Sequence, residues 1–236
     1  MIIRSFIFWF VTCFISICVP IIFFPVFFTK KTKYADKIAT QWVTLIIYLL
    51  KVICKIDYKI LGKENLPKGA CVIACKHQSM WETLAMVVIF DSPAPIYKKE
   101  ILRVPFFGWF LGRTSAIKVD REGATKALRS IVAQAKQYTS DGRNIIIFPQ
   151  GTRVPVGMDV SKYKYQSGVA ALYLNCKVPV VPAALDSGLF WNKKNLLLKK
   201  GTVTLQFLPA INPGLEKREF MKKLEEQIEE GSQKLL

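Results

Sequence analysis

An uncharged apolar segment near the N-terminus constrains the fold of this chain more than any other feature of its sequence. Residues 5–28, SFIFWFVTCFISICVPIIFFPVFF, contain no charged side chain, and about 20 such residues are enough to cross a lipid bilayer. Arg4 precedes the segment, as it would in a secretory signal, but no cleavage site with small residues follows it. We therefore expect the segment to stay in the mature protein and to contact a membrane.

Two arrangements of this membrane segment remain open. Pro20 and Pro25 interrupt the run, and a second apolar stretch at residues 42–53 is too short to span a bilayer comfortably. The chain therefore contains either one spanning helix or a pair of helices that dips into a single leaflet. Positive residues mark the cytoplasmic side of membrane segments, and four lysines closely follow the first run: Lys30, Lys31, Lys33 and Lys37. In both arrangements the rest of the chain is cytoplasmic, at the inner membrane if the source is bacterial.

The net charge indicates what this surface binds. The chain carries a formal charge of +17, and 51% of its residues are hydrophobic. We find no recognisable nucleic-acid-binding module, and a basic, strongly apolar chain suits anionic lipid better. We expect anionic membrane lipids as partners and no nucleic acid.

The cysteines give no sign of a metal centre. The chain has six cysteines and one histidine, no C-x-x-C spacing occurs, and a single histidine cannot complete a usual zinc set. We expect reduced, structural thiols and no bound metal.

Beyond the membrane segment, strand-like runs alternate with helical ones, which is typical of an α/β sheet. Strands are predicted at 57–62, 70–75, 94–98, 115–120, 144–149, 178–185 and 202–209, and helices at 79–90, 122–138, 166–174 and from 215 onwards. The aromatic segment 104–110 suits either the core or a membrane contact. The predicted fold is α/β, with a mixed central sheet flanked by helices and an N-terminal membrane-docking helical segment. We expect two parts, residues 1–54 and 55–236.

The stretch KHQSMWET contains the only histidine, His77, with Glu82 five positions later. Ser79 and Glu82 form S-x-x-E, a capping box that begins many helices, so Glu82 has a purely structural interpretation. His77, however, lies between a buried strand and a helix, where α/β sheets place their ligands. A helix that starts at Ser79 lets Glu82 fold back towards the imidazole.

Such a pair has the chemistry of a general base. A carboxylate on one ring nitrogen fixes the tautomer and stabilises the imidazolium, while the other nitrogen takes a proton from an alcohol. No G-x-S-x-G elbow is present and no cysteine is an obvious partner of His77. The nucleophile is therefore expected to be a hydroxyl group of the substrate.

Basic residues at three predicted strand ends suggest an anionic substrate. FPQGTR presents Thr152 and Arg153 after a glycine turn, KVDR ends at Arg121, and Lys98 ends a third strand. Guanidinium groups bind phosphate through two hydrogen bonds, and glycine lets backbone amides approach it. Each cation alone suits a solvated surface, but together they make a plausible phosphate site. No P-loop is present, so nucleotide hydrolysis is not indicated.

At these residues the chain resembles the glycerolipid acyltransferases of the lysophosphatidic acid acyltransferase type. HQSMWE is similar to their H-x4-D block, KKEILRVPFFGWFLG with IKVDR to their second block, FPQGTR to their F-P-E-G-T-R block, and VPVVPAAL to their proline-bearing fourth block. The resemblance extends from about Asp57 to the C-terminal helix, so it identifies residues 55–236 as an expected glycerolipid acyltransferase domain.

The resemblance implies acyl transfer from a thioester of acyl carrier protein or coenzyme A to the free hydroxyl of a 1-acylglycerol 3-phosphate. It implies His77 as the base, Glu82 as its partner, and no metal or bound cofactor. It places Lys98, Arg121, Gly151, Thr152 and Arg153 at the acceptor phosphate, and it assigns Gln150 of the same block to substrate binding.

Two departures keep alternatives open. Glu82 stands where the family has aspartate, and Gln150 where it has glutamate. We expect Gln150 to alter acceptor binding or rate rather than to abolish the reaction. The acceptor is alternatively another lyso-lipid, such as lyso-ornithine lipid, or the chain is a catalytically silent lipid-binding membrane protein.

Overall fold

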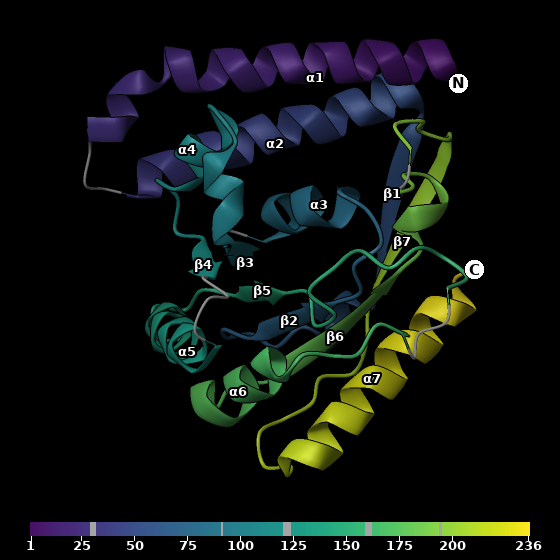
Figure 1. Ribbon diagram of the computed structural model, residues 1–236. Helices are drawn as coiled ribbons and strands as arrows, with labels where there is room; N and C mark the ends of the chain where they lie inside the picture. Colours follow the sequence, from purple (N-terminus) through teal and green to yellow (C-terminus); the bar gives the residue numbers. More distant parts are fainter. Residues whose placement is uncertain (29–31, 91, 120–123, 159–161, 194) are drawn as a thin grey trace.

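A mixed sheet lies at the centre of the molecule, between two layers of helices (Figure 1). The computed structural model describes residues 1–236 except 29–31, 91, 120–123, 159–161 and 194. In the described part of the chain the sheet has seven strands in the order β1-β7-β6-β2-β5-β3-β4. Every neighbouring pair is parallel except β6 and β7, which are antiparallel. The predicted mixed α/β sheet is confirmed.

All seven strands lie where the sequence predicts them, with differences of a few residues at their ends. Their bounds are β1 Ile56–Leu61, β2 Val72–Cys75, β3 Ala94–Lys98, β4 Ile117–Val119, β5 Ile145–Ile147, β6 Val180–Leu185 and β7 Gly201–Phe207. The central strands β2 and β6 are buried along their whole length. This burial explains their continuous apolar sequences, because helices cover both faces of a central strand.

The two faces of the sheet form two separate hydrophobic clusters. On β2, Ile73 and Cys75 pack into the cluster with α1, α2 and α3, whereas Val72 and Ala74 pack against α5, α6 and α7. Successive strand residues point to opposite faces. This alternation continues past the end of β2, so Lys76 and His77 belong to opposite faces of the sheet.

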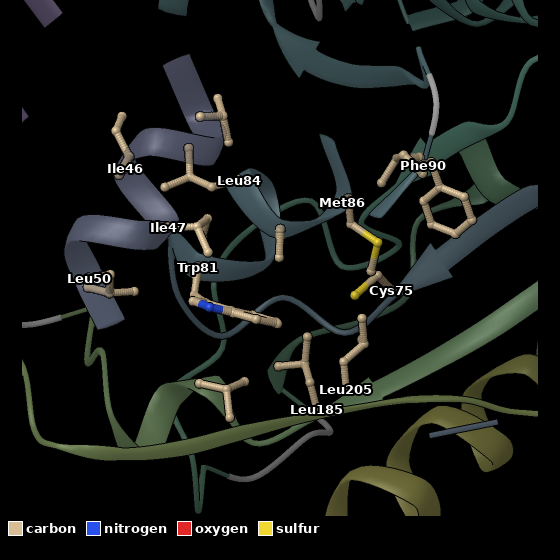
Figure 2. Packing of buried hydrophobic residues seen from close by; sticks show 14 of the residues in the cluster. Ile46, Ile47, Leu50, Cys75, Trp81, Leu84, Met86, Phe90, Leu185 and Leu205 are labelled. Carbon is tan, nitrogen blue, oxygen red and sulfur yellow. The ribbon is translucent and has the colours of Figure 1, made fainter. Parts of the chain in front are cut away.

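One layer consists of α1 (Ile2–Ile22), α2 (Thr32–Cys54), α3 (Trp81–Ile89) and α4 (Phe107–Leu111). In Figure 1, α1 and α2 run in opposite directions, and α3 lies between α2 and the sheet. Figure 2 shows Ile47 of α2 next to Trp81 of α3, with Leu185 and Leu205 of the sheet beyond them, and Ile46, Leu50 and Leu84 belong to the same hydrophobic cluster. The other layer consists of α5 (Ala124–Ser140), α6 (Ser167–Cys176) and α7 (Lys217–Lys234).

The first two helices expose an apolar surface. Both are long and apolar enough to cross a membrane, by length and composition alone. On α1 the large side chains of Phe6, Phe10 and Phe14 are exposed, and only Ser5, Phe8 and Pro20 are buried. The stretch at 42–53 belongs to a longer helix than expected, because α2 begins at Thr32 and has 23 residues. Both arrangements in the membrane stay predictions. Lys33 and Lys37 belong to α2, while Lys30 and Lys31 lie outside the described residues.

The segment 104–110 is part of the core on one side and exposed on the other. Phe110 is 1% exposed and its ring packs 6.3 Å from that of Trp42, centroid to centroid, whereas Trp109 is 53% exposed. One side of α4 therefore belongs to the core and the other faces outwards, beside the apolar helix pair.

Polar contacts attach the helix pair to the sheet. Asp36 of α2 accepts hydrogen bonds from the backbone nitrogen and hydroxyl of Ser115, at 2.8 and 2.6 Å, and forms an ion pair with Arg143 at 3.4 Å. Trp9 of α1 donates to the carbonyl oxygen of Leu196 at 2.7 Å. The helix pair shares a hydrophobic cluster with the sheet. The division into residues 1–54 and 55–236 stays a prediction.

Candidate active site

His77 and Glu82 meet just beyond the carboxyl end of β2. His77 lies two residues after β2, on the sheet face that α3 covers, and Glu82 lies in the first turn of α3. Nδ1 of His77 is 2.8 Å from Oε1 of Glu82. The side chain of Glu82 is fully buried, while that of His77 is 18% exposed. The pair is therefore sealed at its carboxylate end and accessible at its imidazole end.

Glu82 is surrounded by hydrogen-bond donors. Its Oε1 accepts the backbone N–H groups of Gln78 and Ser79 at 2.6 and 2.7 Å, and its Oε2 accepts the hydroxyl groups of Ser79 and Ser187 at 2.6 and 2.7 Å. Burial by itself raises the pKa of this carboxyl, but the hydrogen bonds and charge of His77 and the hydrogen bonds from Ser79 outweigh it and lower the pKa. Glu82 is thus held as a carboxylate at neutral pH.

Glu82 also helps to begin α3. The helix starts at Trp81, two residues later than predicted, and the hydroxyl of Ser79 accepts the backbone N–H of Trp81 at 2.9 Å. In a full capping box that hydroxyl would accept the N–H of Glu82 instead. Of the two capping-box bonds, only the one from the backbone N–H of Ser79 to the carboxylate of Glu82 is present. The same oxygen, Oε1, also contacts His77, so the structural and the proposed chemical role of Glu82 use one atom.

The imidazole of His77 is held in one orientation. Its ring stacks on Phe148, with ring centroids 4.2 Å apart and an angle of 22° between the planes. Its backbone carbonyl accepts the N–H of Val154 at 2.7 Å. Because Nδ1 faces a carboxylate, it carries the proton of the neutral ring, and Nε2 is left as the basic nitrogen.

A cavity of about 450 Å³ opens beside His77. It lies at the carboxyl ends of β3 and β5, which is the usual place for ligands in an open α/β sheet. Polar and apolar groups line it together: His77, Tyr97, Lys98, Gly151, Gln166 and Ser167 with Ile96, Val119, Leu128, Ile131, Ile147 and Phe148. The cavity is therefore suited to a ligand with a charged group and an apolar part.

A second, almost wholly apolar cavity of about 130 Å³ adjoins the first. It lies between α2, α3, α4 and β3, and the two cavities share Thr83, Ile96, Tyr97, Ile101 and Phe148 as lining residues. The two cavities therefore lie on either side of shared walls, and the apolar one extends from these walls towards α2 and α4.

The structure brings part of the predicted phosphate site to the first cavity. Lys98 and Gly151 line it, and Gly151 has a positive φ of 64°, which glycine adopts without strain. Thr152 and Arg153 are half-buried and lie beside the exposed Lys193, whose Nζ is 3.4 Å from Thr152 Oγ1 and 3.0 Å from the carbonyl oxygen of Arg153. Arg121 lies outside the described residues.

Gln150 lies on the other side of its loop from the stacked Phe148. It is 5% exposed, and its Nε2 is 3.4 Å from Oε1 of Glu229 in α7. Glu229 also binds Lys76, the residue before His77. The side chain of Gln150 thus contacts the C-terminal helix.

Two residues of this region were not singled out in the sequence. Ser187 donates to Glu82 across 105 positions of the chain, and Glu229 contacts Lys76 across 153. Ser187 follows the end of β6, which pairs in parallel with β2. A known strand order would therefore have placed it near His77, whereas nothing in the pattern of α7 distinguishes Glu229 from its other glutamates.

No group of three or more His, Cys, Asp or Glu side chains gathers as a metal site would, within the described residues. What the arrangement offers instead is an imidazole paired with a carboxylate, a cation and a glycine turn around a cavity with an apolar cavity next to it.

Comparisons with known proteins agree with this chemistry. A family model described as acyltransferase matches residues 57–186. The 1-acyl-sn-glycerol-3-phosphate acyltransferase of Pseudomonas aeruginosa is 36% identical over 175 residues, which cover 74% of this chain and 67% of the relative. The Saccharomyces cerevisiae protein of the same name is 25% identical over 176 residues, which cover 73% of this chain and 58% of the relative.

A solved structure has the same fold. The crystal structure of the 1-acyl-sn-glycerophosphate acyltransferase of Thermotoga maritima superposes with a TM-score of 0.75 and 22% sequence identity, covering 99% of this chain and 95% of that one. The likeness therefore includes the two N-terminal helices as well as the sheet.

Proposed function

This chain belongs to the acyltransferase family, and from that membership we propose that it acylates the free hydroxyl of a 1-acylglycerol 3-phosphate. The product is phosphatidic acid, and the acyl donor is a thioester of acyl carrier protein or coenzyme A. Relatives that bear the name of this activity support the choice of acceptor.

The hydrogen bond of 2.8 Å between His77 and the buried Glu82, at the edge of the larger cavity, is the observation that carries the proposal. The pair supplies a base that is already in the correct tautomer. A positioned base of this kind accelerates proton transfer by about 10²- to 10⁴-fold.

The reaction needs two proton transfers, one to His77 and one from it, and one exchange of bonds at the carbonyl carbon. Nε2 of His77 accepts the proton of the acceptor hydroxyl while its oxygen attacks the thioester carbonyl, and the charge of Glu82 stabilises the imidazolium. The tetrahedral intermediate then collapses, the C–S bond breaks, and the proton leaves with the thiol. The protein supplies no nucleophile of its own in this sequence of steps.

We assign the phosphate of the acceptor to the basic end of the larger cavity. Lys98 supplies a positive charge there and Gly151 a turn that lets a ligand approach the backbone. Thr152, Arg153 and Arg121 complete the proposed set, in accordance with the block resemblance. The contact of Gln150 with Glu229 supports an indirect effect of Gln150 on the site rather than direct binding of the phosphate.

The acyl chain of the donor fits the adjoining apolar cavity. Phe148, which stacks on His77, and Tyr97 belong to the walls of both cavities. This arrangement would place a thioester near the base while its tail points towards α2 and α4, where burying methylene groups is favourable.

The proposed acceptor is a membrane lipid, and the exposed apolar surface of α1 and α2 supports docking to a bilayer. The positive charge of the chain favours anionic lipid as the surrounding surface and gives no reason to expect nucleic acid. Lys33 and Lys37, close to the start of α2, favour a catalytic side that faces the cytoplasm. In a bacterium this is the inner membrane.

A comparison of acceptors tests the proposal. Purified protein in detergent is given acyl-coenzyme A or acyl carrier protein with either 1-acylglycerol 3-phosphate or lyso-ornithine lipid, and the released thiol is measured. We expect thiol release with the phosphate-bearing acceptor and much less with the other. Equal rates would contradict the phosphate site, and no release with either acceptor would contradict acyl transfer itself.

A further inference from the structure

A buried ion pair lies on the opposite face of the sheet from His77. Lys76 directly precedes His77, is 4% exposed, and has its Nζ 2.5 and 2.6 Å from the two carboxylate oxygens of Glu229. Because strand side chains alternate, the backbone that presents His77 to the cavity presents Lys76 to α7. The C-terminal helix thus binds the residue next to the proposed base.

Glu229 also holds the loop that carries Phe148 and Gly151. Its Oε1 accepts the hydroxyl of Tyr165 at 2.8 Å and lies 3.4 Å from Nε2 of Gln150. Lys76 follows β2, Gln150 follows β5, and Tyr165 precedes α6. One carboxylate therefore links three segments that line or border the larger cavity.

In the cluster of Lys76, Glu229, Gln150 and Tyr165, one positive charge faces one carboxylate. Burial lowers the pKa of Lys76, while the hydrogen bond and charge of Glu229, and the charge of Glu225, act in the opposite direction. Lys76 is the one cation among these contacts and already faces a carboxylate. In the described residues the side-chain oxygen of Gln150 is buried and has no hydrogen-bond donor. A carboxylate at position 150 would add a second negative charge beside Glu229 without a second cation or donor.

We propose that Glu229 is a positioning residue for His77, and that position 150 carries glutamine because Glu229 already supplies the carboxylate that Lys76 requires. The predicted effect of Glu229 on turnover rests on the proposed function, whereas its predicted effect on the orientation of His77 does not.

An exchange of the two side chains tests the proposal. Four proteins are compared: the wild type, Gln150→Glu, Glu229→Gln, and the double variant that carries both changes. Glu226→Gln is the matched control, because it removes the same charge from the exposed side of the same helix. The rate and KM of thiol release are measured. So is the imidazole signal of ¹⁵N-histidine-labelled protein, which contains one histidine.

We expect each single variant to lower kcat by about tenfold or more, with a smaller effect on KM, because small displacements of a catalytic group cost about that much. The double variant should return kcat to within about threefold of the wild type, since it restores one carboxylate for one lysine. The His77 signal should move in each single variant, return in the double variant, and stay unchanged in the control.

Two results would overturn the proposal. One is a double variant in which the two losses add instead of cancelling, and the other is a His77 signal that neither Gln150→Glu nor Glu229→Gln moves. If the wild type transfers no acyl group, the proposed function fails, but the histidine signal still decides whether Glu229 positions His77.

Discussion

Glu82 carries two roles on one carboxylate, and a single amide substitution separates them. Glutamine still accepts a hydrogen bond in a capping box, but it cannot stabilise an imidazolium. We expect Glu82→Gln to fold and to lose about 10²-fold or more in kcat. The measurement is thiol release beside a melting curve, with Glu64→Gln on an exposed turn as control. Unchanged turnover would restrict Glu82 to its structural role.

The same carboxylate makes stability depend on pH. Hydrogen bonds to Glu82 lower its pKa from the ordinary value of 4.5, so the unfolded chain takes up the proton first as the pH falls. The stabilisation is therefore complete above the ordinary pKa and is lost progressively in acid, below about pH 5. We expect the melting temperature to fall less between about pH 5 and pH 3 in Glu82→Gln than in the wild type. Identical slopes would contradict the lowered pKa.

At the scale of residues, the sequence predicts what is local. His77 and Glu82 are five positions apart, and the strand-to-helix junction between them implies their contact. The contacts of Ser187 and Glu229 depend on elements that are more than a hundred positions away in the chain. Gln150 shows the consequence, because its sequence block suggested a substrate contact while its amide faces α7.

At the scale of elements, α2 belongs to the core as well as to the apolar surface. Its buried residues Val43, Ile46, Ile47 and Leu50 follow helical spacing, and Leu50 is 0% exposed. We expect Leu50→Ala to lower the free energy of unfolding in detergent by about 2–5 kcal/mol, because it leaves a cavity between α2 and the sheet.

Leu45→Ala is the matched control for this prediction, since Leu45 is 42% exposed on the same helix. It should change stability by less than about 0.5 kcal/mol. Denaturant titrations of both variants give the comparison. Equal losses of unfolding free energy would show that the buried side of α2 is not part of the core.

Element types were predictable and element ends were not. The run at 94–98 coincides with β3, but the helix predicted from Ser79 begins at Trp81, where the bonds of Ser79 replace a full capping box. The length of α2 was missed because residues 32–41 are not apolar throughout, although they continue the helix and attach it to the sheet through Asp36.

At the scale of the whole molecule, the helix pair lies on the same side of the sheet as α3, the helix that carries Glu82 (Figure 1). We expect the protein to bind vesicles with anionic lipid, and the bound fraction to fall as salt rises from about 0.05 to 0.5 M, because salt screens the net charge. Vesicles of neutral lipid should bind less and show no salt dependence. Equal binding to both would mean that the charge of +17 has no part in docking.

The order of the strands could not be read from the sequence. Alternating strands and helices indicate a sheet with parallel pairs, but β6 and β7 are antiparallel neighbours and β1 pairs with β7 at the edge. The pairing of β1 with β7 joins Ile56 to Gly201, which are far apart in the chain, so tertiary packing decides it. The pairing of β6 with β2 brings Ser187 to Glu82.

The most direct measurement compares product formation by the wild type and His77→Ala. Each is incubated in detergent with a thioester donor and 1-acylglycerol 3-phosphate, and phosphatidic acid and free thiol are quantified together by mass spectrometry. We expect equal amounts of both from the wild type, and about 10²- to 10⁴-fold less from a folded His77→Ala, because the base is gone. Undiminished phosphatidic acid formation by that variant, or none by the wild type, would contradict the mechanism.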